Sequence, residues 1–187
     1  MNGIALFGKM GSGKSTTAKE LFNHFKSVDT ANYPVIYSFG TGVKRCAKEY
    51  FDTESPQKKD RDLLINIGMG MRNIREDVWI EYLSRVMVKD SKRCSHLKLK
   101  HIPIVDDLRF VNEYDFLKEN NFTIVKVSVS PLVQEFRLRK MYPLDWEKHK
   151  YYSSHISENL NREYNVEINS ENPIETNIES IKKYLGY

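Results

Sequence analysis

The stretch Phe7-Gly8-Lys9-Met10-Gly11-Ser12-Gly13-Lys14-Ser15-Thr16 decides how the rest of the chain is interpreted. It matches the pattern G-x-x-x-x-G-K-[ST], in which each fixed position has a physical role. The glycines allow positive φ angles, so the backbone N–H groups of the loop can converge on phosphate oxygens. Lys14 can reach the β- and γ-phosphates of a nucleotide, and the Ser15 hydroxyl can bind Mg²⁺. The pattern therefore predicts a site for a nucleoside triphosphate and a magnesium ion.

The sequence on both sides of this loop supports the prediction. Ile4-Ala5-Leu6-Phe7 is a short apolar run that is typical of a buried strand. After the loop, apolar residues recur at helical spacing from Ala18 to Phe25. Strand, loop and helix thus follow in the required order, and the positive end of the helix faces the phosphates. We expect the nucleotide to be bound by Gly8, Gly11, Ser12, Gly13, Lys14, Ser15 and Thr16.

The composition narrows the class of protein. The 187 residues are 40% hydrophobic and 29% charged, as expected for one soluble globular domain. We see neither a membrane-spanning apolar run nor a secretory signal pattern, so we expect a cytoplasmic protein without a membrane partner. The net charge of +4 suits phosphate ligands but is too small to predict stable nucleic-acid binding. Cys46 and Cys94 lack metal-ligand spacing and are predicted to be free thiols.

Strand and helix patterns alternate along the chain. Further strands are predicted near residues 34–39, 102–105, 123–129 and 166–169, with helical patterns between them. Such alternation predicts one doubly wound α/β domain, with a mostly parallel sheet and helices on both faces. We interpret the basic residues 89–101 as a solvated loop and the polar, aromatic residues 142–165 as a mobile flap.

Two aspartates follow the predicted strand 102–105. Asp106 and Asp107 would lie at the carboxyl end of this strand, where nucleotide sites of parallel sheets are found. A carboxylate at this place can hold Mg²⁺ directly or through water. The residues alone leave open which of the two aspartates does so.

Arginines and lysines form two further groups that could bind anions. Arg109 follows the third strand, and Arg72 and Arg45 lie on predicted helices between the second and third strands. Arg45 opposes its helix dipole, which an anion would relieve, although a solvated side chain explains it equally well. After the fourth strand come Arg137, Arg139 and Lys140. One site for a triphosphate, one for an acceptor and one to close over the transferred group together favour a small-molecule kinase.

The chain resembles, over its whole length, the phage-type deoxynucleoside monophosphate kinases within the P-loop nucleoside monophosphate kinase group. The most specific match is the pattern D-x-R-F-x-N-E, formed by Asp107 to Glu113. The other matching stretches are residues 8–16, 67–72, 77–80, 155–158 and 166–169.

The resemblance implies a fold and a division of the chain. It implies a three-layer P-loop kinase fold with a parallel five-stranded sheet in the order 2-3-1-4-5 and a flexible lid. Residues 1–187 would form a single domain, with the acceptor-binding region at about 40–90 and the lid at about 131–152. The implied reaction is ATP-dependent and needs Mg²⁺, and phage-encoded relatives would act in the host cytoplasm.

The resemblance also implies roles for particular residues. It places Asp107, Arg109 and Glu113 at the monophosphate acceptor, and we assign Arg45, Arg72 and Trp79 to the same site, although Trp79 also fits the apolar face of its helix. Because Asp107 is then used by the acceptor, Ser15 and Asp106 are the predicted ligands of Mg²⁺. Arg137 and Arg139 are predicted to be catalytic lid arginines, with at least one expected to lie over the helix surface instead.

Several functions remain open at this point. A monophosphate is already an anionic nucleophile, so transfer to it requires positioning and charge neutralisation but no general base. The first alternative is a kinase for another phosphorylated acceptor, of the phosphomevalonate or dephospho-coenzyme A type. The second is a nucleotide-dependent switch or nucleic-acid-binding ATPase, although the chain has no N-K-x-D motif for guanine. The partners are expected to be small nucleotides, and a homodimer is left open.

Overall fold

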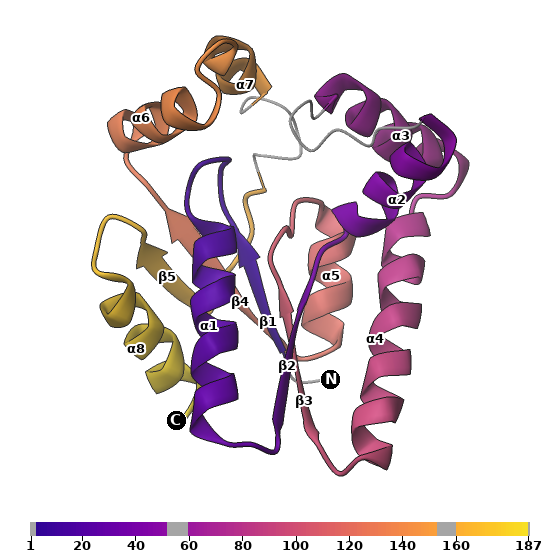
Figure 1. Ribbon diagram of the computed structural model, residues 1–187, viewed down its shortest axis with the longest axis vertical. Helices are drawn as coiled ribbons and strands as arrows, with labels where there is room; N and C mark the ends of the chain where they lie inside the picture. The colour runs from indigo at the N-terminus through magenta and orange to yellow at the C-terminus, as the bar shows by residue number, and fades with distance from the viewer. Residues whose placement is uncertain (1–2, 52–59, 153–159, 187) are drawn as a thin grey trace.

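The structure is a computed structural model that describes residues 3–51, 60–152 and 160–186. Its sheet consists of β1 (Gly3–Phe7), β2 (Asn32–Tyr37), β3 (Lys100–Val105), β4 (Phe122–Ser128) and β5 (Val166–Asn169). The strands pair in the order β2-β3-β1-β4-β5, and every pair is parallel. The predicted doubly wound fold and the predicted strand order are confirmed (Figure 1).

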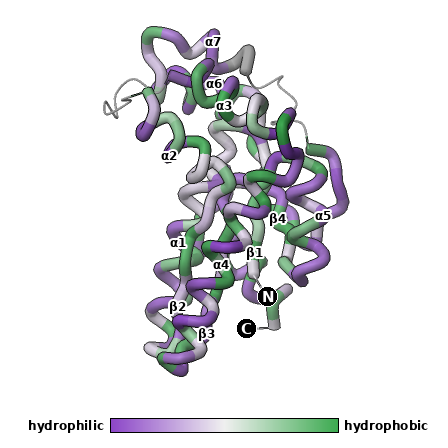
Figure 2. The backbone as a smooth tube through the Cα atoms, turned by 90° about the vertical axis from the view of Figure 1, so that its right-hand side faces the viewer, coloured by the Kyte–Doolittle hydropathy of each residue, from purple (hydrophilic) through white to green (hydrophobic). Residues whose placement is uncertain are grey.

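Eight helices are seen in the described part of the chain. They are α1 (Lys14–Val28), α2 (Gly40–Phe51), α3 (Arg61–Ile74), α4 (Val78–His96), α5 (Val111–Glu119), α6 (Pro131–Met141), α7 (Trp146–Tyr152) and α8 (Ile174–Leu185). Figures 1 and 2 both show α2, α3, α6 and α7 gathered above the carboxyl ends of the strands. These four helices therefore lie at the end of the sheet where the phosphate loop follows β1.

The side chains of β1 explain why helices cover both faces of the sheet. Because successive strand residues point to opposite faces, Ile4 and Leu6 pack with α1 and α8, whereas Ala5 and Phe7 pack with α4 and α5. All the residues of β1 are buried, as expected for a central parallel strand. Along the helices hydrophobic and hydrophilic residues alternate, as Figure 2 shows for α5.

The prediction that residues 89–101 form a solvated loop is wrong. The helix α4 continues to His96, and β3 begins at Lys100. The reason is that the apolar face of α4 continues through the buried side chains of Met87 and Cys94, while the basic residues occupy its exposed face. The charge of this segment hid a helical period that has only a few apolar members.

The predicted flap, residues 142–165, contains a helix in its described part. Residues 146–152 of this segment form α7, and residues 153–159, which include the matching stretch 155–158, lie outside the described residues. Cys46 and Cys94 are free thiols, as predicted. Among the described residues, none of the helices combines the length and apolar character that crossing a bilayer requires.

Packing between α2 and α4 gives a stability prediction. A methyl group added at Gly42 would lie 2.7 Å from the ring of Trp79, so Gly42→Ala should destabilise the protein by about 1–3 kcal/mol through overpacking. Gly70 is the matched control, because its added methyl group would meet nothing within 4 Å. Gly70→Ala should stabilise the protein by about 0.5–1 kcal/mol, since alanine favours the helix. Urea unfolding measures both, and equal effects would contradict the packing described here.

Candidate functional site

A cavity of about 670 Å³ lies at the carboxyl ends of the strands. It is bordered by the phosphate loop (residues 8–16), α2, α3, the connection from β3 to α5, α6, and the connection from β5 to α8. Its charged lining residues are Lys14, Lys44, Arg61, Arg72, Arg109, Arg137, Asp106, Asp107 and Glu113. Cations outnumber carboxylates in this lining, which suits a ligand with several negative charges.

The phosphate loop has the conformation that its glycines were expected to allow. Gly8 has a φ of 147°, and a side chain there would lie 2.3 Å from the carbonyl oxygen of Val127. The Lys14 amine lies inside the turn, where it donates to the carbonyl oxygens of Gly8 at 2.6 Å and Lys9 at 2.9 Å. The buried hydroxyl of Ser12 has no hydrogen-bond partner among the described residues. The loop is thus wound around its lysine and retains polar groups for a ligand.

The two residues predicted to bind the metal lie in contact. The Ser15 hydroxyl donates to Oδ2 of Asp106 at 3.2 Å. Burial raises the pKa of Asp106, and the neighbouring Asp107 raises it further, whereas Ser15, Lys44 and Lys14 lower it. A carboxylate and a hydroxyl side by side are hard oxygen donors of the kind that Mg²⁺ prefers. Their chemistry fits the ion, and the role in binding it stays a prediction.

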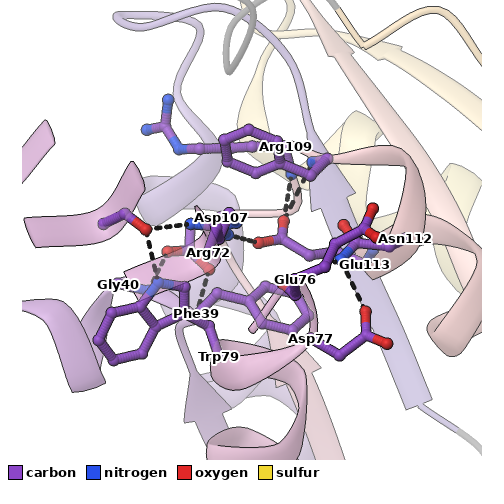
Figure 3. A network of polar contacts seen from close by, with 12 residues as sticks. Phe39, Gly40, Arg72, Glu76, Asp77, Trp79, Asp107, Arg109, Asn112 and Glu113 are labelled. Atoms are coloured by element: carbon purple, nitrogen blue, oxygen red, sulfur yellow. Dashed lines mark hydrogen bonds and ion pairs between the residues drawn. The ribbon is translucent and has the colours of Figure 1, made fainter. Parts of the chain in front are cut away.

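Asp107 binds the protein itself. Its carboxylate accepts hydrogen bonds from the Ser38 hydroxyl at 2.5 Å and from the backbone N–H groups of Phe39 at 2.8 Å and Gly40 at 2.9 Å (Figure 3). Gly40 is the first residue of α2, so the carboxylate compensates the positive end of this helix. Both oxygens are used in this way, so Asp107 fixes α2 to the end of β3.

Glu113 holds a second set of groups in the same region. It forms a buried ion pair with Arg72 and accepts hydrogen bonds from the backbone N–H groups of Arg109 at 3.0 Å and Phe110 at 3.1 Å. Burial and then Asp107 raise the pKa of Glu113 to about 7, although Arg72 and the two N–H groups lower it. The Arg72 guanidinium also lies 3.9 Å from the centre of the Phe110 ring. Arg109 lines the cavity, and in Figure 3 its guanidinium points away from Glu113.

The two predicted lid arginines differ in position. Arg137 lines the cavity and donates to the carbonyl oxygen of Gly11 at 3.1 Å and to the hydroxyl of Ser170 at 2.8 Å. Arg139 lies outside the cavity lining, pairs with Glu135 at 2.8 Å and covers the ring of Trp146. One of the two therefore lies over the helix surface, as expected, and only Arg137 reaches the phosphate loop.

Two residues assigned to the acceptor lie elsewhere. The Arg45 side chain is 70% exposed, pairs with Glu49 at 3.8 Å and does not line the cavity. The preceding residue, Lys44, lines it instead, because one helical step of about 100° separates the two side chains. Trp79 is buried in the core, where its indole N–H donates to the carbonyl oxygen of Gly68 at 3.1 Å. The apolar face of α4 thus explains Trp79, and solvation explains Arg45.

Sequence reasoning missed a cation on α3. Arg61 lines the cavity, and its Nη1 lies 3.0 Å from the sulfur of Met10 in the phosphate loop. It is the first residue of α3 and belongs to no motif, so no pattern could have indicated it. The end of β5 was missed too, although Ser170, Asn172 and Asn177 line the cavity there. A strand end followed by Asn172-Pro173 was the available signal for this wall.

Comparisons with known proteins agree with this architecture. No protein-family model and no curated protein matches the chain. The APS kinase CysC of Mycobacterium tuberculosis, solved with AMPPNP and APS, has a TM-score of 0.63 at 10% identity, covering 100% of this chain and 98% of its own. A gluconokinase from Sinorhizobium meliloti has a TM-score of 0.53 at 14% identity, with coverages of 99% and 91%. A sugar kinase from Janibacter reaches 0.53 at 15% identity, with coverages of 100% and 95%. At these identities the likeness shows a P-loop kinase fold.

Glu113 makes stability depend on pH in a predictable direction. Because its pKa is raised on folding, the folded chain holds this proton more tightly, and stability falls as pH rises from 4.5 to about 7. Glu113→Gln should remove this contribution, which is on the order of 3 kcal/mol for a shift of this size. The unfolding free energy of the variant relative to that of wild type should therefore rise over this range, in favour of the variant, and level off above it. Urea titrations at several pH values test this, since Asp106 contributes equally to both proteins. A constant difference would contradict the buried, raised carboxyl.

Proposed function

We propose that this chain transfers the γ-phosphoryl group of ATP to the phosphate of a deoxynucleoside monophosphate. The observation that carries the proposal is that one cavity joins the phosphate loop to a second cationic wall, formed by Arg72 of α3 and Arg109 after β3. A nucleotide-dependent switch needs only the first of these walls. A kinase needs both, because the donor and acceptor must meet end to end.

The donor half of the cavity contains the groups that a triphosphate requires. The loop offers its N–H groups, the Lys14 amine and the Ser12 hydroxyl, and Arg137 reaches the loop from α6. Lys14 now donates to loop carbonyl oxygens, and we expect it to exchange these partners for phosphate oxygens when the nucleotide binds. The nucleoside of the donor would lie against the wall between β5 and α8, on the side of β1 opposite to α2.

The acceptor half favours a phosphate over a hydroxyl group as nucleophile. Transfer to a hydroxyl requires a general base, whereas a phosphate is already anionic at neutral pH. Of the three carboxylates in the cavity lining, Asp107 holds α2, Glu113 holds Arg72 and Asp106 is the proposed ligand of Mg²⁺, so none is left to act as a base. The two arginines instead offer planar sets of donors that suit phosphate oxygens.

The residues of the chain would act by holding the reactants and excluding water. Ser15 and Asp106 would hold Mg²⁺, which when bound neutralises charge on the donor phosphates. Lys14 and Arg137 would lie along the oxygens of the transferred group, and Arg109 would hold the acceptor. Helices α6 and α7, within the proposed lid of residues 131–152, lie over this space and reach α3 through an ion pair of 2.7 Å between Lys148 and Asp62. Their closure would keep water from the donor.

An assay of acceptors tests the proposed function directly. ADP release should depend on an added nucleoside monophosphate, and the labelled γ-phosphoryl group should appear in a nucleoside diphosphate. The panel holds the common deoxynucleoside and ribonucleoside monophosphates, with phosphomevalonate, dephospho-coenzyme A and gluconate as competing classes. Label transferred only to a competitor would assign the chain to that class. Release of inorganic phosphate alone, or stimulation by DNA, would favour an ATPase.

Arg137 and Arg139 form a matched pair for a test of catalysis. Arg137→Ala should lower kcat at least about a hundredfold, because it removes a cation aimed at the phosphate loop. Arg139→Ala removes the same charge two residues away on the outer surface, and kcat should stay within about threefold of wild type. Steady-state kinetics at saturating substrates would decide between them. A larger loss for Arg139 would reverse our placement of the two side chains.

Variants of Arg109 and Arg45 test whether Arg109 binds the acceptor or the donor. Arg109→Ala should raise the KM for the monophosphate at least about tenfold, a loss of ~1.4 kcal/mol, with little change in the KM for ATP. Arg109→Lys should restore this only partly, because lysine lacks the planar fork. Arg45→Ala should change neither KM, since Arg45 lies outside the cavity lining. A rise in the KM for ATP alone would place Arg109 at the donor.

A further inference from the structure

The Glu113 carboxylate is buried, and the protein itself supplies three hydrogen-bond donors to it. Its side chain is 1% exposed although the residue borders the cavity. One oxygen pairs with Nη2 of Arg72, and the other accepts the N–H groups of Arg109 and Phe110. A carboxylate surrounded by three donors cannot also bind a phosphate, which would meet it with like charge. Glu113 can therefore serve the expected acceptor site only in a way that does not involve contact with the phosphate.

The groups that Glu113 binds are those that form the acceptor wall. Arg72 is held between Glu113 on one side and the ring of Phe110 on another, and its Nη1 also contacts the carbonyl oxygen of Gly68 at 3.4 Å. Among the described residues its Nε has no hydrogen-bond partner. A guanidinium has five N–H donors, so this clamp fixes its plane and uses only some of them, while the side chain stays 13% exposed and lines the cavity. Figure 3 shows Glu113 between Arg72 and the backbone of Arg109.

Protonation would disrupt this arrangement in a specific way. Three donors converge on the carboxylate, and a proton on either oxygen removes the negative charge that pairs with the Arg72 guanidinium, so the hydrogen bonds to Glu113 lose their charge assistance. Glutamine is uncharged as well, and its amide NH₂ group cannot accept a hydrogen bond, so it imitates the loss of the ion pair that protonation causes. The charged groups that act on Glu113 are Arg72 of α3 and Asp107 after β3. Because the pKa of Glu113 is about 7, its ionised form becomes dominant between pH 6 and 8.

We propose that Glu113 is a positioning residue, which sets the Arg72 guanidinium for an acceptor phosphate without contacting the acceptor itself, while the N–H groups of Arg109 and Phe110 hold its carboxylate in place. The inference rests on the proposed function, because it assumes that a monophosphate binds at this wall. It predicts that the ionised carboxylate, rather than the mere presence of a side chain, determines acceptor affinity. It also predicts that Glu113 acts through Arg72.

The test measures acceptor binding in a double-mutant cycle at two pH values. The probe is whichever deoxynucleoside monophosphate binds wild type most tightly by calorimetry, which does not require turnover. Glu113→Gln should weaken binding about tenfold at pH 8 and by less than about twofold at pH 6, where wild type is itself largely protonated. The probe's own ionisation is common to both proteins and cancels in their ratio. In an Arg72→Gln background, Glu113→Gln should change binding by less than about twofold at either pH.

A control on the same helix turn excludes a general effect on α5. Asp115 is exposed on α5 and does not line the cavity, so Asp115→Asn, which removes a carboxylate charge as Glu113→Gln does, should give a ratio that does not change with pH. A pH-independent loss in Glu113→Gln, or a full loss in the Arg72→Gln background, would overturn the positioning role. Circular dichroism shows which variants fold, and Arg72→Gln alone should still weaken binding at pH 8 if Glu113→Gln does not fold. Unchanged binding in Arg72→Gln would overturn the proposal.

Failure of the proposed function and failure of the positioning role of Glu113 would give different results. A wild-type chain that binds a monophosphate but transfers nothing to it would refute the kinase reaction while leaving the binding cycle fully informative. A wild-type chain that binds no monophosphate would refute the proposed substrate and this inference together. Binding and turnover with no pH-dependent coupling would refute the inference alone.

Discussion

The proposed acceptor half of the cavity depends on two carboxylates that follow β3 and are bound by other parts of the protein. Asp107 takes the N–H groups at the start of α2, and Glu113 takes Arg72 of α3 and the backbone of Arg109 and Phe110. Charge-assisted hydrogen bonds of this kind are strong, and removing one partner leaves a buried charge or donor unsatisfied. The position of α2 and α3 over the sheet is thus set by the chain that leaves β3.

The donor half depends on a different constraint, the close approach of backbone to backbone. The phosphate loop passes so near the end of β4 that a side chain at Gly8 would collide with the carbonyl oxygen of Val127. Arg137 then joins the loop to Ser170 at the end of β5. The two halves meet at the neighbouring ends of β1 and β3, where Ser15 contacts Asp106. Phosphoryl transfer would take place at this junction.

The sequence predicted the features that follow from local patterns. The phosphate loop is specified by its glycines and the strands by apolar runs, so a parallel sheet could be predicted from the residues, whereas its strand order was implied by the family resemblance. The prediction for residues 89–101 was wrong because the helical pattern there has only a few apolar residues among many charged ones. The element type there is decided by packing of Met87 and Cys94 against the core, which the composition of the segment does not reveal.

The site was predictable only in part, because side-chain direction is not contained in residue type. Lys44 and Arg45 are adjacent cations, and only the rotation of α2 determines which of them faces the cavity. Arg137 and Arg139 differ in the same way on α6. The burial of Glu113 and its three donors could not be read from the pattern D-x-R-F-x-N-E. Arg61 carried no signal, since its place depends on where α3 meets the phosphate loop.

The central claim is that one cavity holds donor and acceptor together. The most direct measurement is the binding of a bisubstrate analogue, in which adenosine and a deoxynucleoside are joined through a chain of phosphates. The account predicts that one analogue binds per chain, more tightly than either nucleotide alone, and that it competes with both ATP and the monophosphate. An analogue that competes with ATP only, and binds no more tightly than ATP, would contradict it.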